Sequence, residues 1–353
     1  MLAGLLTNHV ICGSVVIVVN RLTSPSLLSV RTANNTMSLK NSQTICNYAE
    51  NATNKMTTRK ISNSEVGTWL SCRRKYYYRF DLLLEPKKLS HSLQRGILFH
   101  LAMESFNIAY MEDRNKNFND AAFKGASLIQ AQFLNYETYD SEIAVDCLRI
   151  YNIYMQILEQ RIDEWEILEA EQQHDLPINE SYSMPIKLDL LVRERSTGEI
   201  ALVDYKTCYD FWSDDQIALS AQASKYIGAL RNDGIRVDKL FLEQIRYRKI
   251  KDPTMDQLFR RTTVKPGSAK IRNVMADHIT ASNSIIQYRA LPDAQRNQLA
   301  TRVLNPMVCK GCEVRDLCKS ELDGGDIGYA IQVGYKKNTY DYNQIAPNVL
   351  EEL

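Results

Sequence analysis

The sequence contains few of the residues that interrupt regular secondary structure. Of 353 residues, 14 are glycine and 9 are proline, about half the usual share of these two types. This scarcity excludes collagen-like, low-complexity and fully disordered chains and favours a compact, helix-rich fold. A chain of this length can also bury a large core, so it does not need a disulfide framework for stability.

The sequence also lacks a long apolar run. The only run in the first 55 residues spans residues 10–19, whereas a membrane-spanning helix needs about 20 residues. The run resembles the apolar region of a signal peptide, but residues 1–9 contain no Lys or Arg, so the usual charged region is missing. We therefore expect a cytoplasmic protein that does not enter a membrane. We interpret residues 1–55 as a poorly ordered or dispensable extension and residues 56–353 as a single domain.

The sequence has almost no net charge, because 43 Lys and Arg residues balance 42 Asp and Glu residues. The charges are nevertheless segregated. Residues 59–95 carry nine basic and three acidic side chains, and residues 246–272 carry nine basic and two acidic ones. Residues 111–182 carry five basic and fifteen acidic side chains. Any one run could be a solvated charged face. Two basic segments around an acidic one predict a polyanion-binding surface beside a carboxylate-bearing site.

The hydrophobic pattern changes its period along the chain. It predicts a helix capped by Ser62, a second helix from Gly96 and one or two further helices within residues 119–165. Strand-like segments follow at residues 166–176, 185–194 and 199–207. After them come one more helix at residues 213–232 and a last strand at residues 237–247. This order, with its helical insertion, predicts a mixed α/β domain.

Two aspartates and a lysine fall on one face of the predicted hairpin. If residues 195–198 form a four-residue loop, Asp189 lies opposite Asp204, with Cβ atoms about 5 Å apart. Lys206 shares their face because side chains alternate along a strand. A three-residue loop would separate the aspartates, and a salt-bridged surface hairpin is the plainer alternative.

Like charges this close repel each other unless a cation lies between them. Carboxylate ligands suit Mg²⁺ or Mn²⁺, so the hairpin predicts a site for a divalent cation. Gln222 and Tyr226, spaced i, i+4 on the next helix, share a face that could reach a phosphate group. His100 follows Gly96 on the earlier helix, although a lone histidine is more often a core residue than a ligand.

Three of the eight cysteines are close together in the sequence, as Cys309, Cys312 and Cys318. A tetrahedral metal site needs a fourth ligand, for which Cys72 is the best candidate because it begins the folded region. The spacing alone leaves both zinc and iron–sulfur open. Thiolate ligation indicates a reducing compartment, and we interpret Cys147 and Cys208 as core residues.

Together these motifs resemble the RecB-like branch of the PD-(D/E)xK nuclease superfamily. The resemblance covers roughly residues 61–320, and the cysteine spacing is similar to that of the iron–sulfur subgroup, which includes AddB-type nucleases, CRISPR-associated RecB-like nucleases and exonuclease V. The motifs that carry it are Gly96-Ile-Leu-Phe-His100, Glu171, Asp189 in KLDLLV, Asp204-Tyr205-Lys206 and Gln222-x₃-Tyr226.

The resemblance implies a restriction-endonuclease-like α/β core and a set of site residues. Mg²⁺ or Mn²⁺ would be bound by His100, Asp189, Asp204 and the Tyr205 carbonyl, with Lys206 activating the attacking water and Gln222 and Tyr226 near the DNA. The first-strand acidic residue would be Glu171, with Glu169 as the alternative. Cys72, Cys309, Cys312 and Cys318 would bind a [4Fe–4S] cluster that joins the two ends of the domain.

The expected function is that of a metal-dependent deoxyribonuclease, a single-strand-preferring exonuclease in DNA repair, recombination or replication. A non-catalytic DNA-binding subunit is one alternative, because Ile186-Lys187 stands where the family often has glycine. A restriction-type endonuclease is another. We expect Tyr77 and Phe80 to be core residues. Phosphate contacts are expected from Arg73, Arg74, Lys75, Arg246, Arg248 and Lys249.

Overall fold

The computed structural model describes residues 7–12, 15–21, 28–32, 35–39, 59–113, 117–132, 139–179 and 182–338. The chain divides into a small unit of residues 1–59 and 179–182 and a large unit of residues 60–178 and 183–353. The small unit contains an antiparallel sheet in the order β1 (Thr7–Cys12), β2 (Val15–Arg21), β3 (Leu28–Thr32) and β4 (Asn35–Leu39). The interpretation of residues 1–55 as a dispensable extension stays a prediction. None of the described helices is long and apolar enough to cross a membrane.

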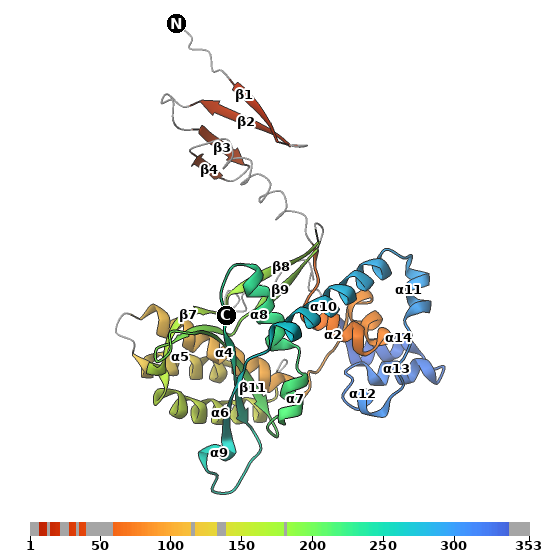
Figure 1. Ribbon diagram of the computed structural model, residues 1–353. Coiled ribbons are helices and arrows are strands. Elements are labelled where there is room, and N and C mark those ends of the chain that lie inside the picture. Colours follow the sequence, from red (N-terminus) through yellow and green to blue (C-terminus); the bar gives the residue numbers. More distant parts are fainter. Residues whose placement is uncertain are drawn as a thin grey trace. The chain divides into compact units, whose positions relative to one another are not determined.

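A five-stranded mixed sheet forms the centre of the large unit (Figure 1). Its order is β13 (Phe259–Val264), β12 (Lys239–Arg246), β11 (Ile200–Cys208), β10 (Leu190–Glu194) and β7 (Trp165–Ala170). Strands β11 and β12 are parallel, and the other neighbours are antiparallel. A smaller sheet joins β5 (Arg59–Lys60), β9 (Tyr182–Lys187) and β8 (Gln173–Asn179).

Alternation of side chains along β11 divides the core into two layers. Ala201, Val203 and Tyr205 pack against one group of helices, and Leu202 faces the other group. The first group is α4 (His91–Glu112), α5 (Phe118–Gln132) and α6 (Ser141–Glu159), and the second is α7 (Asp214–Leu219), α8 (Gln222–Asn232) and α10 (Ser268–Arg289). Hydrophobic side chains therefore cover both faces of the sheet, and the polar residues of a site are expected at the ends of its strands.

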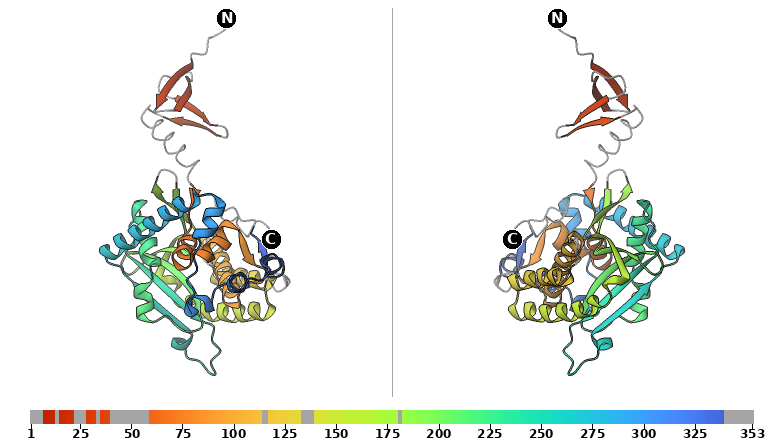
Figure 2. Two further views of the ribbon diagram at one scale, coloured as in Figure 1. Left: turned by 90° about the vertical axis from the view of Figure 1, so that its right-hand side faces the viewer. Right: turned by 90° about the vertical axis from the view of Figure 1, so that its left-hand side faces the viewer.

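The first and last described segments of the large unit pack together (Figures 1 and 2). Arg74 is ion-paired with Glu321, and Arg79 lies 2.5 Å from Glu313. Two sets of elements meet here. The early set is α2 (Asn63–Ser71), α3 (Arg73–Tyr76), the π-helical turn η1 (Tyr77–Asp81) and β6 (Leu84–Pro86). The late set is α11 (Asp293–Leu299), α12 (Pro306–Lys310), α13 (Arg315–Leu322), α14 (Ile327–Gly334) and β14 (Tyr335–Lys337). Strand β14 pairs antiparallel with β6. The remaining short elements are η2 (Ile162–Glu164) and α9 (Met255–Leu258).

The predicted order of elements and the hairpin register are confirmed. Arg193 pairs with Ile200, and the Glu194 N–H donates to the Glu199 carbonyl at 3.0 Å, so the loop has the four residues expected. The Ser62 cap is also confirmed, since its side chain accepts a hydrogen bond from the Glu65 N–H.

Several details of the prediction are wrong. The second helix begins at His91 rather than Gly96, because Ser90 caps it one turn earlier. The expected strand over residues 166–176 is two strands, separated where Glu171 adopts a φ of 54°. The expected strand over residues 185–194 is β9 and β10, which belong to different sheets, and the expected helix over residues 213–232 is α7 and α8. Tyr77 is only partly buried, whereas Tyr76, Tyr78 and Phe80 are core residues. The wider π-helical turn changes which side chains face inward, and a regular helical period cannot anticipate it.

Helix α5 packs closely against its neighbours at Gly125. A methyl group at this position would lie 2.2 Å from the Tyr151 hydroxyl and 2.6 Å from the Ala102 carbonyl oxygen. We predict that Gly125→Ala lowers the free energy of unfolding by about 1–3 kcal/mol, since an overpacked core must distort. Gly67→Ala is the matched control, because its methyl group would meet nothing within 4 Å, and it should stabilise the helix by up to about 1 kcal/mol. Equal effects of the two changes in urea unfolding would contradict this packing.

Candidate active site

A cleft of about 480 Å³ opens at the end of the large sheet where β7 and β11 end and β10 begins. One wall is the first half of α4, including Gly96, His100 and Glu104, and the other is formed around Asp189 and Lys206. Asp189 lies in the short break between β9 and β10. The Asp189 backbone stays hydrogen-bonded at this break, since its carbonyl accepts from the Glu171 N–H at 3.2 Å, and its side chain lines the cleft.

Asp189 is held by three groups. Its Oδ2 accepts a hydrogen bond from the Tyr205 N–H at 2.9 Å, and its Oδ1 lies 3.3 Å from His100 Nδ1. Burial acts to raise the pKa of Asp189, but His100, Lys206 and the Tyr205 N–H together lower it below its usual value. The same pair acts on His100, where burial opposes the charge but Asp189 raises the pKa to about 9. The two side chains therefore form an ion pair at neutral pH.

Asp204 is the most deeply buried aspartate of the cleft region, with 4% of its surface exposed. Its carboxylate oxygens lie 2.9 and 2.8 Å from Lys206 Nζ, and Gln222 Nε2 donates to Oδ1 at 2.6 Å. Burial raises the pKa of Asp204; Lys206 opposes that shift and the neighbouring Asp189 adds to it. The expected grouping of Asp189, Asp204, Lys206 and Gln222 is therefore present.

Glu171 rather than Glu169 reaches the cleft. The positive φ of Glu171 separates β7 from β8 and turns its side chain inward, whereas Glu169 Oε2 lies 3.0 Å from His174 Nε2. Burial, and then the charge of Asp189, raises the pKa of Glu171 to about 7, although Lys187 opposes the shift. The structure thus favours Glu171 of the two alternatives.

Sequence reasoning missed two charged residues of the cleft. Lys187 Nζ lies 2.8 Å from Glu171 and 3.3 Å from Glu104. Glu104 could have been found, because it lies one helical turn after His100 and so shares its face of α4. Lys187 could not, because strand alternation alone does not reveal the break that follows it.

The two remaining predicted residues contribute differently. The Tyr205 side chain is buried in the core, so it is the backbone of this residue that meets Asp189. Tyr226 is partly buried on α8, and burial together with Asp204 and Asp189 raises its pKa above the usual value. Its hydroxyl therefore stays protonated and can donate a hydrogen bond.

The carboxylates of the cleft fit a divalent cation by their chemistry. Glu171 Oε1 is buried without a hydrogen-bond partner, and an unpartnered buried carboxylate oxygen is suited to a hard cation. Among the described residues, no three His, Cys, Asp or Glu side chains are arranged to hold a metal ion. Each carboxylate is instead paired with a cationic side chain: Asp189 with His100, Asp204 with Lys206 and Glu171 with Lys187.

A family model described as the PD-(D/E)XK nuclease superfamily matches residues 60–319. The chain belongs to this superfamily. The predicted superfamily and α/β fold class are thereby confirmed, whereas the RecB-like branch and the iron–sulfur subgroup stay predictions. Among curated protein sequences, none matches this nuclease.

Several solved structures resemble parts of the nuclease at low identity. SSO0001 is 13% identical, with 64% of this chain and 95% of that chain covered and a TM-score of 0.32. A candidate exonuclease from Eubacterium rectale is 13% identical, with coverage of 78% and 94% and a TM-score of 0.43. LHK-Exo in complex with dAMP is 12% identical, with coverage of 57% and 93% and a TM-score of 0.28.

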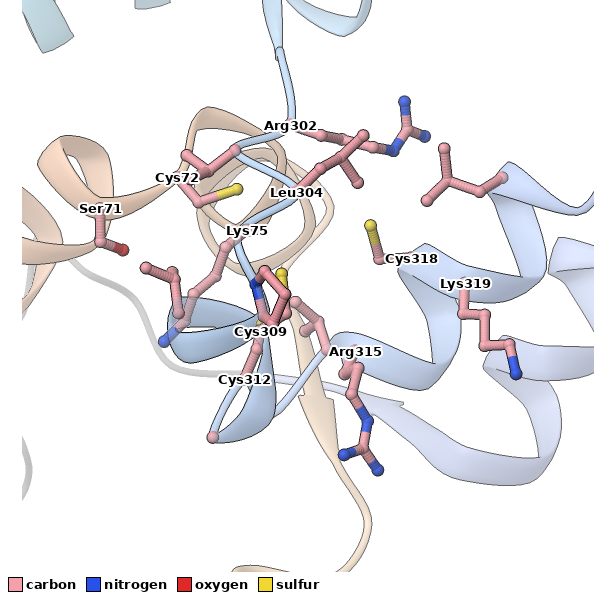
Figure 3. Close-up of a pocket in the computed structure, with 16 residues that line it drawn as sticks. Ser71, Cys72, Lys75, Arg302, Leu304, Cys309, Cys312, Arg315, Cys318 and Lys319 are labelled. Atoms are coloured by element: carbon pink, nitrogen blue, oxygen red, sulfur yellow. The ribbon is translucent and has the colours of Figure 1, made fainter.

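Four cysteines of the nuclease line one cavity of about 350 Å³ (Figure 3). Cys72 comes from the junction of α2 and α3, and Cys309, Cys312 and Cys318 come from α12, the following turn and α13. None of the four forms a disulfide. The cavity therefore combines four free thiols from the two ends of the large unit.

The other two cysteines of the large unit, Cys147 and Cys208, are core residues, as expected. Burial raises the pKa of Cys147 to about 12 and that of Cys208 to about 11. Both thiols are therefore protonated at neutral pH and unreactive.

The residues expected to contact DNA differ in their access to solvent. Arg74 is buried between Glu321 and Asn297, so a direct phosphate contact is not open to it in this structure. Arg73 stacks on Trp69, and Lys75 lies 3.1 Å from Glu313. In the second basic segment, Arg248 and Lys249 are exposed, whereas Arg246 is partly buried and stacks on Phe211.

Gly96 forms part of the cleft wall, and a methyl group there would meet nothing within 4 Å. We predict that Gly96→Ala raises the free energy of unfolding by about 0.5–1 kcal/mol, because glycine weakens a helix interior. The same methyl group would narrow the cleft, so DNA cleavage should fall several-fold. Gly67→Ala is again the control and should stabilise without loss of cleavage. Undiminished cleavage by Gly96→Ala would show that substrate does not approach this wall.

Proposed function

We propose that this superfamily member is a divalent-metal-dependent deoxyribonuclease with a preference for single strands with free ends. The observation that supports this most is the pairing of the buried Asp204 with Lys206, which lines the open cleft together with Asp189. Buried carboxylates next to one lysine are costly for stability, and this combination of groups is suited to metal-assisted hydrolysis of a phosphodiester. The superfamily match supports nuclease chemistry independently.

We assign the binding of Mg²⁺ or Mn²⁺ to His100, Asp189, Asp204 and the Tyr205 carbonyl, with Glu171 at the edge of the site. A bound divalent cation would polarise the scissile phosphate and lower the pKa of a bound water. The chain itself supplies the orientation. Gln222 and the Tyr205 N–H each fix one carboxylate by a hydrogen bond.

Lys206 is the proposed electrostatic catalyst. Its ammonium group contacts Asp204 and lies in the wall of the cleft. A preorganised positive charge at this position can orient the attacking water and stabilise the negative charge that develops on the phosphate. Tyr226 and Gln222, one turn apart on α8, are proposed to contact the DNA beside it.

For the second site, we propose a [4Fe–4S] cluster on Cys72, Cys309, Cys312 and Cys318, rather than zinc. The four free thiols of one cavity fit either group by donor type. The site would join α3 to α12 and α13, next to the Arg74–Glu321 ion pair. Its role would be to stabilise the fold, and such thiolate ligation would favour a reducing compartment.

Processing of DNA ends in repair, recombination or replication is the cellular role we propose. The exposed cations Arg248 and Lys249 and the half-exposed Arg73 can contact phosphates without reading bases. Such contacts make binding dependent on salt but not on sequence. Of the aromatic side chains that alternate with the basic ones near Cys72, Tyr76, Tyr78 and Phe80 are buried, so the proposed preference for single strands rests there on the partly buried Tyr77.

The catalytic assignment is tested by removing the lysine and its partner separately. We predict that Asp204→Ala and Lys206→Ala each lower cleavage of single-stranded DNA by at least about 100-fold, because each removes charge stabilisation in the transition state. The assay uses strands labelled at the 5′ or the 3′ end, with Mg²⁺ present. Lys124→Ala, an exposed lysine on α5, serves as the control. Full activity in both site variants would refute the assignment, and cleavage of closed circles would indicate an endonuclease.

The cluster assignment is tested by the iron content of anaerobically purified protein. We predict that Cys309→Ser lowers both the bound iron and the melting temperature, because the cluster links two ends of the domain. Cys208→Ser is the matched control, since it alters a buried thiol outside the cavity and should leave the iron content unchanged. A colourless, zinc-containing wild-type protein would rule out the iron–sulfur cluster.

A further inference from the structure

A second hollow, of about 860 Å³, lies next to the active-site cleft. Its walls are the segment from Pro86 to Ser90, the turn after α12, and helix α14 with the start of β14. Leu93, in the first turn of α4, lines both the hollow and the cleft. The hollow therefore adjoins the active-site cleft at Leu93; we call it the α14 groove.

The α14 groove is mainly positive. Its cationic side chains are Lys75, Lys87, Lys88, Lys310 and Arg315. Among the described residues, two acidic ones line it. Glu313 is neutralised by Lys75 at 3.1 Å and Arg79 at 2.5 Å, and Asp316 lies 3.1 Å from Arg315.

Lys310 is the cation most available to a ligand. It is exposed on the groove wall, and the described residues offer it no ion pair or hydrogen bond. Its ammonium group can therefore bind an anion without breaking an existing interaction. Exposed ion pairs such as Arg315–Asp316 are weak, so those cations can also turn to a phosphate at little cost.

The groove also exposes an aromatic ring. Tyr329 on α14 has 65% of its surface exposed, beside Val333 at 57%, and Leu93 at the junction with the cleft has 44%. Apolar side chains of this size are rarely exposed as a group unless they bind something. A ring beside lysines can stack on an unpaired base, whereas the bases of a duplex are already stacked on one another.

We propose that the α14 groove binds the single strand of DNA that continues from the scissile phosphate, with Lys310 on a phosphate and Tyr329 stacked on a base. This inference rests on the proposed nuclease function and specifies it further. The α14 groove would be a surface for single-stranded DNA outside the cleft, formed by elements that carry none of the catalytic motifs. The preference for single strands would then come from this groove as well as from the segment that follows Cys72.

The test is the affinity for labelled single strands of increasing length, measured by fluorescence anisotropy in EDTA so that no cleavage occurs. Wild-type affinity should increase as the strand grows from about 4 to about 12 nucleotides, lengths within the range of single-strand binding sites. In Lys310→Ala/Tyr329→Ala, affinity for the longer strand should fall about tenfold or more. The single change Lys310→Ala should reduce the slope of log affinity against log salt by about 0.7.

Lys124→Ala, which removes an exposed lysine from α5, is the matched control and should keep the wild-type length dependence. If the double variant also keeps it, the α14 groove is not the strand-binding surface, while nuclease activity in the cleavage assay would leave the proposed function intact. A wild-type protein that neither binds nor cleaves single strands would instead refute the proposed function. Equal loss of duplex and single-strand binding in the double variant would overturn the preference for unpaired bases.

Discussion

Three carboxylates cannot lie close together in a poorly hydrated cleft unless positive charge is brought to them. This constraint dominates the active site, where each of Asp189, Asp204 and Glu171 lies beside a cationic side chain. The remaining strain is visible in Glu171, whose pKa is raised to about 7 by burial and by Asp189. A divalent cation would supply the missing positive charge, so the arrangement is suited to binding a metal.

The fold meets this constraint by interrupting its own regular elements. Asp189 lies in the break between β9 and β10, and Glu171, at the break between β7 and β8, adopts a positive φ; both carboxylates line the cleft. Strand β11 then fixes Asp204 and Lys206 on one face, because a one-residue slip in register would turn both away. The apolar helices cover both faces of the sheet, and the cleft opens at the ends of its strands.

Regular periodicity made much of this arrangement predictable. A four-residue loop between two alternating strands was sufficient to place Asp189 opposite Asp204, and a helical repeat was sufficient to bring Gln222 near them. The irregular features could not be predicted: the positive φ at Glu171 decided between Glu169 and Glu171, and the break after Lys187 brought that lysine into the cleft. The role of Arg74 depended on Glu321, far away in sequence, so local charge patterning suggested a DNA contact where the structure has a buried ion pair.

The most direct test of the account is the binding of Mn²⁺ to the purified protein, measured by isothermal titration calorimetry without DNA. The account predicts a stoichiometric site in the wild-type protein that is lost or weakened at least about tenfold in Asp189→Asn, because the neutral amide is a poor ligand for a hard cation. Lys124→Ala should bind Mn²⁺ like the wild type. Unchanged Mn²⁺ binding by Asp189→Asn would show that these carboxylates do not form the metal site.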